Sequence, residues 1–460
     1  MGLLASAALA GCAGTAEPRT AQIAPLIETA PTAQSDANAA VLVPSENGAF
    51  IIGSSESGGV EVYGLDGARI AATPGGAVVG VDARYGAPTP DGRAGWTVAG
   101  LDGGANRLRL YEYAPGAAPV DRTTRNIDLG FAGESLCLFR DPRDATLYAF
   151  ALGGDGQIAQ YMVSQSAEGY DARLVRELRL ASEVSYCTVD DADGDLYVAE
   201  QGVGFWRFDA DPEAEVVPEL IDAVRLGRVT EEAGGLTVYN HYLIGSDASA
   251  NRFHLYDRAN DHTYLGSFTL VGVEAAGGLN ALSTPLGAAF PAGALVAMDN
   301  ENTAGANYKL VSFTDIAAAL GLQTGAPRDP RTPPTSTVPI VRPTMETVPV
   351  ETDGDSADDP AIWIDRNDPS RSLIIGTQKQ SGLYVYDMQG AVVQFLPDGR
   401  MNNVDLRGGF QLGGQSVALV TASSRTTDTI SIYRVDAAAR RLVDVSDGPQ
   451  HTGFIDPYGL

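Results

Sequence analysis

A segment near the C-terminal end of the chain repeats a segment near its beginning. IIGTQKQSGLYVYDMQG (374–390) follows IIGSSESGGVEVYGLDG (51–67) at an interval of 323 residues, and VDLRGG (404–409) follows VDARYG (81–86) at the same interval. One interval shared by two separate matches indicates a duplicated domain rather than a chance motif. The fold therefore has to accommodate the same structural unit twice.

A shorter repeat lies inside the long one. Short apolar segments that end on an aromatic residue recur every 47–57 residues, as VEVY (60–63), LRLY (108–111), IAQY (158–161), FWRF (205–208), FHLY (253–256) and KLVSF (309–313). Their side-chain period of two is typical of strands, and a repeat of ~40–50 residues is typical of the small sheets of a β-propeller. Six such sheets fit between residues 36 and 322. The sequence thus predicts an all-β chain whose first domain is a six-bladed β-propeller.

The later copy restarts this pattern. LYVY (383–386) and ISIY (430–433) stand where the first two blades of a second propeller are expected, and the sequence ends at Leu460. Two blades cannot enclose a core, because stacked repeats need neighbours on both sides. We therefore expect residues 351–460 to form the first two blades of a second, incomplete propeller.

Composition divides the rest of the chain. The N-terminal run MGLLASAALAGCAG resembles a bacterial lipobox, in which Cys12 would be lipidated after signal cleavage; a frayed apolar terminus is the alternative. Residues 325–350 contain seven prolines and should form an extended, fairly stiff linker. The expected order is a lipoprotein-type signal segment, a tether, a degenerate propeller, a Pro-rich linker and the start of a second propeller, over residues 1–12, 13–35, 36–322, 323–350 and 351–460. A lipobox would place the protein in a bacterial cell envelope, as a periplasmic or outer-membrane lipoprotein or a secreted protein, with Cys12 as its only membrane contact.

The two remaining cysteines admit several interpretations. Cys137 and Cys187 would pair in an oxidising periplasm, but they fall in different predicted blades, so two buried thiols are preferred. Cys137 and Arg143 also fit the C-x5-R skeleton of a cysteine phosphatase loop. The glycines of a phosphate cradle are absent, however, and LCLFRDPRDATLYAF (136–150) indicates strand, turn and strand.

Charge and motif content limit the chemistry. The chain carries 58 acidic and 31 basic residues, a formal net charge of −27, which argues against nucleic acid as a partner. Its four histidines have no zinc spacing, and HExxH and G-x-S-x-G are absent. Any catalysis must then rest on carboxylates and a hard cation, and oxygen ligands select Ca²⁺ or Mg²⁺. DADGD (191–195) resembles a calcium loop, but its position between two strands favours a hairpin turn.

Several motifs in a fixed order give the chain a specific resemblance. ADDPAIW (357–363), GTQKQSGLYVYD (376–387), RMNNVDLRGGF (400–410), TASSRTTDTISIY (421–433) and DPYGL (456–460) closely resemble the β-propeller phytases. Members of that family are six-bladed, calcium-dependent enzymes that remove phosphates from inositol hexakisphosphate. The resemblance is strong over 345–460 and weaker, but in the family's order, over 36–322. Tandem members with a degenerate first propeller and an intact second one are a known arrangement.

The resemblance assigns roles to residues of the later copy. In the family an acidic pair and a backbone carbonyl bind calcium, while basic and aromatic side chains hold substrate phosphates. The matching positions are Asp358, Asp359 and Val404 for calcium, and Lys379, Arg425 and Tyr458 for phosphate binding and catalysis. The remaining family positions would follow Leu460, so this chain by itself is expected to be inactive.

The earlier copy resembles the family less closely. Its acidic calcium positions are Asp36, Glu183, Glu200 and Asp299. The family's lysine, arginine, tyrosine and one glutamate are replaced by Glu56, the turn at Gly103 and Gly104, the region of Glu134, and Gly234. We expect this copy to bind some calcium but to hold phosphate poorly.

The implied activity is that of a 3-phytase-type phosphoric monoester hydrolase, in which a calcium-activated water attacks phosphate in the second propeller. Several Ca²⁺ ions would be its cofactors, and phytate or other inositol phosphates its partners, with a monomer as the expected state. Clustered cations would reverse the sign of an acidic surface toward a polyanion. Lys379 and Arg425 would neutralise charge developing on the phosphate. Two alternatives are a non-catalytic calcium-binding lipoprotein propeller and another calcium-dependent propeller hydrolase, such as a lactonase or phosphotriesterase.

Overall fold

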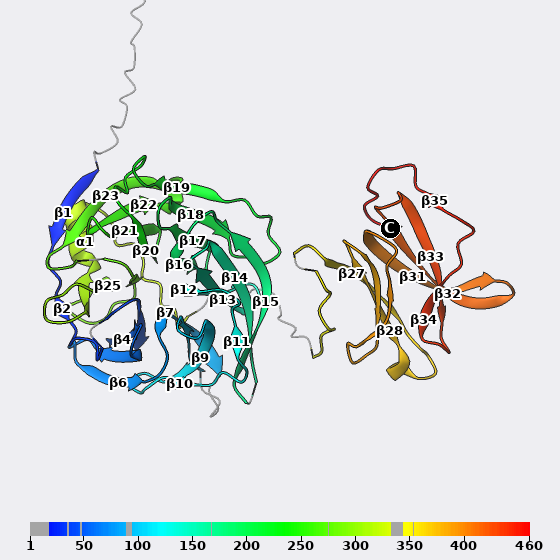
Figure 1. Ribbon diagram of the computed structural model, residues 1–460, viewed down its shortest axis with the longest axis horizontal. Coiled ribbons are helices and arrows are strands. Elements are labelled where there is room, and N and C mark those ends of the chain that lie inside the picture. The colour runs from blue at the N-terminus through cyan, green and yellow to red at the C-terminus, as the bar shows by residue number, and fades with distance from the viewer. Residues whose placement is uncertain are drawn as a thin grey trace, which may run out of the picture. The chain divides into compact units, whose positions relative to one another are not determined.

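A computed structural model describes residues 18–460, except for residues 35, 47, 89–93, 167, 275, 333–343 and 353. The chain divides into two compact units, Met1–Thr337 and Val338–Leu460, and both are built of β-sheets (Figure 1). Each sheet is named after the first of its consecutively numbered strands. No helix in the described part of the chain is long and apolar enough to cross a membrane. Cys12, the expected lipidation site, lies outside the described residues.

The described part of the first unit contains six sheets of four or five strands. The β3 sheet comprises β3 (Ala40–Ser45), β4 (Gly48–Ser55), β5 (Gly59–Gly64) and β6 (Arg69–Thr73). The β7 sheet comprises β7 (Val78–Pro88), β8 (Ala94–Asp102), β9 (Arg107–Tyr113), β10 (Val120–Asp121) and β11 (Ile127–Asp128). The β12 sheet comprises β12 (Gly133–Arg140), β13 (Leu147–Gly153), β14 (Gln157–Gln165) and β15 (Tyr170–Arg179).

The remaining three sheets follow the same plan. The β16 sheet comprises β16 (Val184–Asp190), β17 (Asp195–Glu200), β18 (Gly204–Asp209) and β19 (Glu219–Ala223). The β20 sheet comprises β20 (Ala233–Tyr239), β21 (Tyr242–Asp247), β22 (Arg252–Asp257), the 3-10 helix η1 (Arg258–Asn260), β23 (Thr263–Leu270) and β1 (Arg19–Ile23). The β24 sheet comprises β24 (Leu279–Leu282), β25 (Ala294–Asp299), β26 (Asn307–Ser312) and β2 (Ile27–Glu28).

Side-chain alternation explains the outer and middle strands. In the first half of β9, Leu108 and Leu110 are buried, whereas Arg107 and Arg109 are partly exposed, as expected for a strand segment with one wet face. Strand β13 is buried at every residue. A strand buried on both faces requires a neighbouring sheet on each side.

Neighbouring sheets of the first unit contact one another in chain order, and β24 also contacts β3. At that last contact Tyr308 donates a hydrogen bond from its hydroxyl to the Ser54 carbonyl (2.7 Å). A Cβ on Gly53 would lie 2.4 Å from the Tyr308 ring, so only glycine fits there. The Leu42 amide donates to Asn280 Oδ1 (3.0 Å) across the same contact. Six sheets with these contacts are consistent with a β-propeller.

The predicted tether over residues 13–35 is wrong for its strand-forming part. β1 pairs in parallel with β23, and β2 pairs in antiparallel fashion with β26. Ile23 is buried in the core of the first unit. These strands satisfy two sheet edges that would otherwise present unpaired backbone groups. Their shortness, with Pro25 between them, hides them from a search for periodicity.

The segment after the sixth sheet packs against the first unit. The chain leaves the sixth sheet through α1 (Phe313–Leu320), which ends at Gly321 in a left-handed conformation. The part of the expected linker that follows is also held in place. Tyr242 donates a hydrogen bond to the Gln323 carbonyl (3.0 Å), and the Arg328 amide donates to Ser283 Oγ (2.9 Å). The beginning of the Pro-rich segment is therefore part of the first unit.

Cys137 and Cys187 form a disulfide with a Cα–Cα distance of 5.7 Å. The preference for two buried thiols is therefore wrong. The residues lie in different sheets, as expected, but β12 and β16 are the first strands of neighbouring sheets and contact each other. Two cysteines in different sheets can therefore be close enough in space to form a disulfide.

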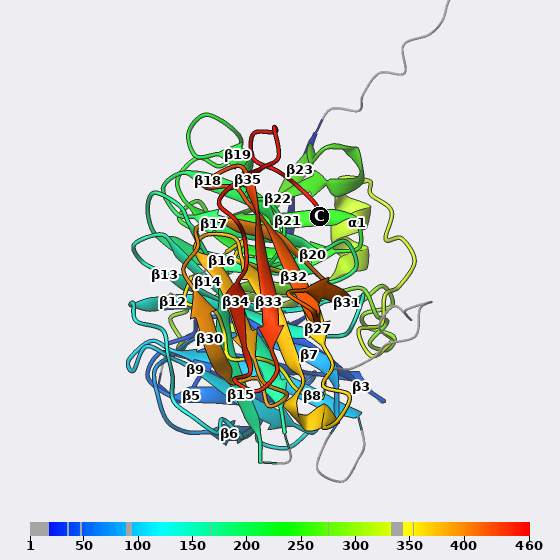
Figure 2. The same cartoon turned by 90° about the vertical axis from the view of Figure 1, so that its right-hand side faces the viewer.

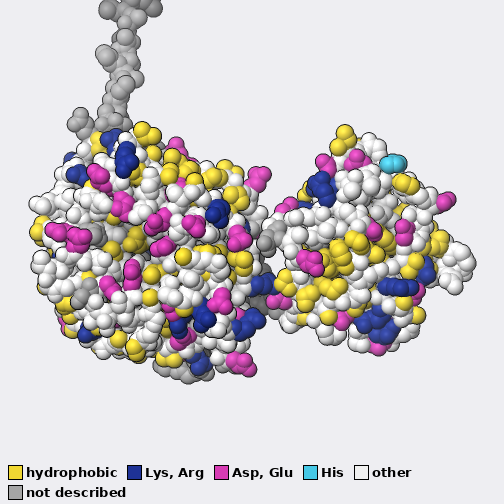
Figure 3. Space-filling model, in the orientation of Figure 1, with side chains coloured by type: hydrophobic (Ala, Val, Ile, Leu, Met, Phe, Trp, Pro, Cys, Tyr) yellow, Lys and Arg dark blue, Asp and Glu magenta, His cyan; other side chains and the backbone are white. Residues whose placement is uncertain are grey.

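The second unit contains two sheets in its described part. The β27 sheet comprises β27 (Ala357–Trp363), the 3-10 helix η2 (Pro369–Arg371), β28 (Leu373–Gln378), β29 (Gly382–Tyr386) and β30 (Val392–Leu396). The β31 sheet comprises β31 (Met401–Leu412), β32 (Gln415–Ser424), β33 (Thr429–Asp436), β34 (Arg441–Asp444) and β35 (Gln450–His451), whose long strands run side by side in Figure 2. The two sheets share a buried cluster that includes Leu373, Val385, Val404, Val420 and Tyr433. Hydrophobic side chains are also exposed on this unit (Figure 3). The exposed ones include Ile362, Ile364, Phe410 and Phe454.

Candidate functional site

Two bulges hold the candidate metal residues of the second unit. The pairing of β27 with β28 shifts between Ala357 and Pro360, and the pairing of β31 with β32 shifts between Met401 and Val404. A bulge removes residues from the ladder and redirects their side chains, and bulges are common beside active sites. The residues within the two shifts are Asp358, Asp359, Asn402 and Asn403.

Asp359 joins the two bulges. Its Oδ2 accepts hydrogen bonds from the Val404 amide (2.9 Å) and from Asn403 Nδ2 (3.2 Å). Its own amide donates to Thr377 Oγ1 (2.9 Å), and that hydroxyl donates to the Asn402 carbonyl (3.1 Å). The structure therefore brings together Asp359 and Val404, two residues that the resemblance assigns to calcium.

Asn402 is a possible ligand that the sequence analysis did not identify. Its side chain is completely buried, and Oδ1 has no hydrogen bond partner among the described residues. Leaving such a group unsatisfied costs about 1–3 kcal/mol. A bound cation would remove this cost. Two carboxylates, an amide oxygen and a backbone carbonyl are the oxygen donors that Ca²⁺ prefers, so these residues fit calcium. The two adjacent asparagines of NNVD (402–405) were the sequence feature that could have indicated this ligand.

Lys379 lies at the end of β28, beside the first bulge. Its Nζ contacts Asp355 Oδ1 (2.9 Å) and Asp358 Oδ2 (3.4 Å), and the side chain is mostly buried. The hydrogen bond to Asp355 holds the pKa of Lys379 above its ordinary value, with a further contribution from Asp358. Lys379 is therefore charged at neutral pH. It contacts both the candidate metal residue Asp358 and the more exposed Asp355.

Arg425 and Tyr458 form a second pair. The Arg425 guanidinium lies over the Tyr458 ring, 5.0 Å from its centre. Arg425 makes no ion pair with a described residue, and its Nε is buried without a hydrogen bond partner there. A cation held against a ring but free of carboxylates is available to an anion.

The C-terminal segment connects this pair to the metal residues. The Gly459 amide donates to Asn403 Oδ1 (2.8 Å), and Asn403 in turn donates to Asp359. Tyr458 therefore stands next to the second bulge, although it is distant from Asp359 in sequence. The six predicted positions of the second unit thus fall into two groups of contacts. In one group Lys379 contacts Asp358. In the other, Asp359 contacts Val404 and Asn403, and Asn403 contacts the segment that places Tyr458 against Arg425.

Two acidic candidates of the first unit are satisfied by protein groups instead. Asp299 is buried and pairs with Lys309 Nζ at 2.6 Å. Glu200 is also buried, and its oxygens accept hydrogen bonds from Ser182 and from Trp206 Nε1 (2.9 Å). An internal cation at Asp299 occupies the charge that a metal ion would need. Lys309 was visible in the sequence as the only charge in the strand NYKLVS (307–312).

The phosphate-binding positions expected in the first unit carry acidic residues or glycine instead of lysine or arginine. Glu56, which replaces the family's lysine, accepts a hydrogen bond from Asn38 Nδ2 (2.8 Å). Burial raises the pKa of Glu134, and the charges of Glu183 and Glu56 raise it further. Asp36 Oδ1 accepts a hydrogen bond from the Ser55 hydroxyl. This surface suits a cation and repels phosphate.

The weaker motifs are accounted for by structural contacts. Cys137 is in the disulfide, and Arg143 pairs with Asp141 (2.5 Å) and Asp211 (2.7 Å), so the C-x5-R match is not a phosphate loop. DADGD (191–195) forms the β16–β17 turn, as preferred. Its carboxylates pair with arginines rather than a metal, since Asp191 contacts Arg84 at 2.8 Å and Asp193 contacts Arg258 at 3.0 Å.

Carboxylates, a buried amide oxygen and two cationic side chains at neighbouring bulges define a site suited to a metal ion together with an anion. The comparison with protein families agrees with this chemistry. The phytase family model matches residues 2–331 and 335–460, so the chain belongs to the phytase family. A 3-phytase from Bacillus subtilis (strain 168) is 27% identical over 303 residues, which represent 59% of this chain and 77% of that protein. The resemblance seen in the sequence is confirmed at the level of the family.

Proposed function

We propose that this protein removes phosphate groups from phytate or related inositol phosphates with the help of calcium. We place its active site in the bulge cluster of the second unit, which comprises the residues of the two bulges with Val404, Lys379, Arg425 and Tyr458. The observation that carries the proposal is Arg425, a cation without an ion pair among the described residues, placed against Tyr458. Contacts through Asn403 connect that pair to Asp359. An anion-binding group beside an oxygen-rich metal cluster is what a calcium-dependent phosphatase requires.

The residues divide into two roles in this proposal. Asp358, Asp359, Asn402 and the Val404 carbonyl would hold calcium. When bound, calcium ions supply positive charge that polarises a phosphoryl oxygen and lowers the pKa of water. Arg425 and Lys379 bind non-bridging phosphate oxygens and stabilise charge as it develops there. Tyr458 orients Arg425 through its ring and offers a hydroxyl to the same anion.

Net charge supports a role for metal ions in substrate capture. The chain has a formal charge of −27, so a polyphosphorylated sugar alcohol is repelled by the protein as a whole. Calcium bound at the bulges would reverse the local sign. The alternative of a lactonase or phosphotriesterase gains no support from Lys379 and Arg425, because a neutral ester does not need two cations.

The test is phosphate release from phytate in saturating Ca²⁺ and in chelator, with wild type, Arg425→Ala and Arg441→Ala. Arg441 is an exposed arginine of the same sheet that lies outside the cluster, so it is the matched control. This proposal replaces the expectation that the chain by itself is inactive. We expect activity only with Ca²⁺, a loss of roughly 10²–10³ in Arg425→Ala, and wild-type rates in Arg441→Ala. Full activity of Arg425→Ala would disprove the assignment of the site. Phytate binding without any phosphate release would favour the non-catalytic alternative.

We further propose that the two units are tandem copies of one propeller-type domain. The six sheets of the first unit would be blades of a closed ring, with the β24 sheet against the β3 sheet. The β27 and β31 sheets would correspond to the β3 and β7 sheets. The 323-residue interval and the family matches in both units support this proposal.

For the first unit we propose cation binding without catalysis. The charges of Glu183 and Glu56 contribute to the raised pKa of Glu134, whereas Asp299 is neutralised by Lys309. Calcium should therefore raise the melting temperature of the first unit through the three glutamates. A ligand at a hundredfold excess over its Kd stabilises by about 2.7 kcal/mol. Identical melting curves in calcium and in chelator would exclude this binding.

We also propose that the protein is exported and anchored through Cys12. The Cys137–Cys187 disulfide supports an oxidising compartment. Labelling with a radioactive fatty acid in a bacterial host tests the anchor, since Cys12→Ser should abolish the label and Cys137→Ser should not.

A further inference from the structure

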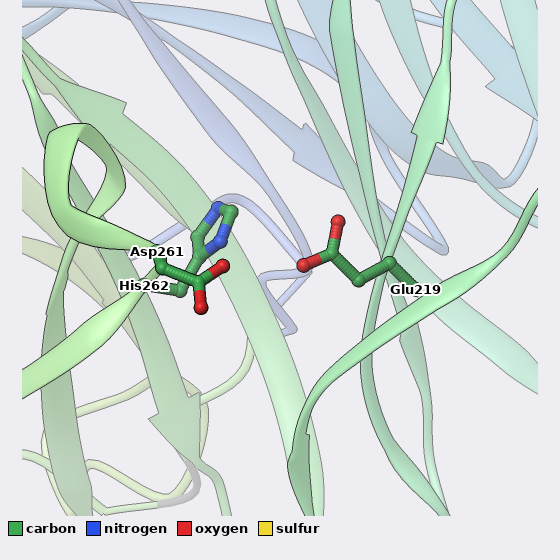
Figure 4. A group of neighbouring side chains, drawn as sticks. All are labelled: Glu219, Asp261 and His262. Atoms are coloured by element: carbon green, nitrogen blue, oxygen red, sulfur yellow. The ribbon is translucent and has the colours of Figure 1, made fainter.

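A group of three metal-binding residue types lies in the first unit, away from the acidic positions discussed above. Glu219 is the first residue of β19, and Asp261 and His262 form the turn between η1 and β23. One ligand atom from each lies within 4.8 Å of the other two. Figure 4 shows the imidazole edge beside the Asp261 carboxylate, with Glu219 extending toward both from another strand.

This group lies at the opposite end of the strands from the family-type acidic residues. In the β16 sheet Val184 pairs with Glu200 at one end, and Asp190 pairs with Asp195 at the other. Glu219 pairs with Arg207, toward the Asp195 end of the sheet. The group is therefore separate from the surface that carries Glu183 and Glu200.

Hydrogen bonds define which nitrogen of His262 carries the proton. Nε2 lies 3.1 Å from the Tyr197 hydroxyl. That hydroxyl donates its hydrogen to Asp195 Oδ2 (3.1 Å) and accepts from Arg258 Nε (2.8 Å). It can therefore only accept from His262, so Nε2 is protonated and Nδ1 keeps a free lone pair. Nδ1 is buried and has no hydrogen bond partner among the described residues.

The two carboxylates leave further acceptors without donors. Arg207 donates to Glu219 Oε2 (3.0 Å) while its Nε binds Asp195 (2.7 Å), which leaves Glu219 Oε1 available. No described residue donates a hydrogen bond to the Asp261 carboxylate. Three acceptors thus converge without a hydrogen between them.

We propose that Glu219, Asp261 and His262 bind a divalent transition-metal ion of the zinc class. One imidazole nitrogen and two carboxylate oxygens match the ligands of zinc, whereas calcium takes oxygen ligands. The Tyr197 hydroxyl bound to Nε2 is the outer partner that orients a ligating histidine. Glu219 is 43% exposed, so its side chain can move to the distance of about 2.0–2.2 Å that zinc requires.

The proposed site has room for a further ligand, and a metal bound there would also link two sheets. Glu219 also lines a cavity of about 510 Å³ with Arg207 and Asp209. Water or a small anion entering from this cavity would complete the coordination. The metal would connect the edge strand of the β16 sheet to a hairpin of the β20 sheet, two elements far apart in sequence.

The experiment measures zinc bound to the full chain by equilibrium dialysis and metal analysis at pH 7.5. Wild type, His262→Gln and His451→Gln are compared, because His451 is an exposed histidine of the second unit. We expect His262→Gln to bind one zinc equivalent fewer than wild type and His451→Gln to bind the same amount. Calcium in hundredfold excess should not displace this equivalent.

A second readout separates specific coordination from weak surface binding. Cobalt in place of zinc should give visible absorption bands in wild type and in His451→Gln, and these bands should be absent in His262→Gln and Asp261→Asn. Zinc should also raise the melting temperature of wild type but not of His262→Gln. Equal zinc stoichiometry in wild type and His262→Gln, or displacement of the ion by calcium, would overturn the proposal.

Discussion

Strands β3 and β27 each pair with one of the two repeated sequence segments but have different surroundings. Leu42 pairs with Ile51, and Ile362 pairs with Ile374, the residue that repeats Ile51. Leu42 is 3% exposed and shares a buried cluster with Leu282 and Phe290 of the β24 region, whereas Ile362 is 59% exposed. The two side chains have similar chemistry. Burial at this position is therefore supplied by the neighbouring sheet and not by the strand itself.

An aspartate–arginine pair shows the same contrast. Arg84 contacts Asp82 and also reaches Asp191 (2.8 Å) and the carbonyl groups of two other sheets. Arg407, which repeats Arg84, contacts Asp405 at 2.8 Å, donates to the adjacent Leu406 carbonyl and is 79% exposed. The first copy uses the pair to join three sheets, and the second copy leaves the same pair at its surface.

The two copies differ in the opposite sense in their chemistry. The second unit keeps Lys379 beside Asp358, together with Arg425, which has no ion pair among the described residues. The first unit has Glu56 in place of the lysine and a buried Asp299–Lys309 pair. Packing is therefore more complete in the first unit, and the candidate phosphate-binding groups are more complete in the second.

Reversing the charge at the repeated lysine should have the largest effect. Lys379→Glu gives the second unit the residue of the first and places another carboxylate beside Asp358. We expect phosphate release from phytate to fall by roughly 10²–10³ in saturating calcium, the usual effect of removing one charge stabiliser. Glu56→Lys is the reciprocal control and should leave the rate unchanged. A gain of activity in Glu56→Lys with no loss in Lys379→Glu would reverse the roles of the two units.

Removal of the disulfide should destabilise only the first unit. The cysteines are separated by 50 residues, and a loop of that size corresponds to about 4 kcal/mol in the chain-entropy model. In the Cys137→Ser, Cys187→Ser double variant, the unfolding transition of the first unit should move to lower denaturant concentration. The transition of the second unit serves as the internal reference. A shift of both transitions would show that the units do not unfold separately.

Truncation of the two repeated aliphatic residues should separate the copies by a few kcal/mol. Leu42→Ala removes a buried side chain and should cost about 2–5 kcal/mol. Ile362→Ala removes an exposed one and should change stability by less than about 0.5 kcal/mol. Chemical denaturation of each variant measures both values. Equal costs would mean that the face of β27 is covered in solution.

Acid should weaken the first unit through His254 by a smaller amount. This histidine is buried with neither nitrogen hydrogen-bonded to a described residue, and burial lowers its pKa to about 4 despite nearby Asp247 and Asp222. Its contribution is complete above the unfolded value of about 6.5 and is lost as pH falls through the folded value. We expect a loss of about 2 kcal/mol between pH 7.5 and pH 5. His254→Leu should remove this pH dependence, and an unchanged dependence would exclude His254 as its source.

The sequence predicted what periodicity and repetition can encode. The aromatic-ended strands follow from local patterns, whereas the candidate metal residues Asp359 and Val404 were implied only by the resemblance to the phytase family. Strands β1 and β2 were missed because they are too short to show a period, and their partners lie far along the chain. The Cys137–Cys187 bond and the Asp299–Lys309 pair depend on which sheets are neighbours, which strand patterns do not specify. Asn402 was missed because only burial shows that its oxygen has no donor.

The pairing of β1 with β23 limits when the first unit can finish folding during synthesis. Thr20 contacts Ser267, 247 residues later in the chain. At a synthesis rate of 5–20 residues per second, β1 would leave the ribosome about 12–50 s before its partner strand exists. The β20 and β24 sheets therefore cannot be completed during synthesis of the first four sheets. Folding of this unit finishes only when its two ends meet, so the growing chain remains incompletely folded for most of its synthesis.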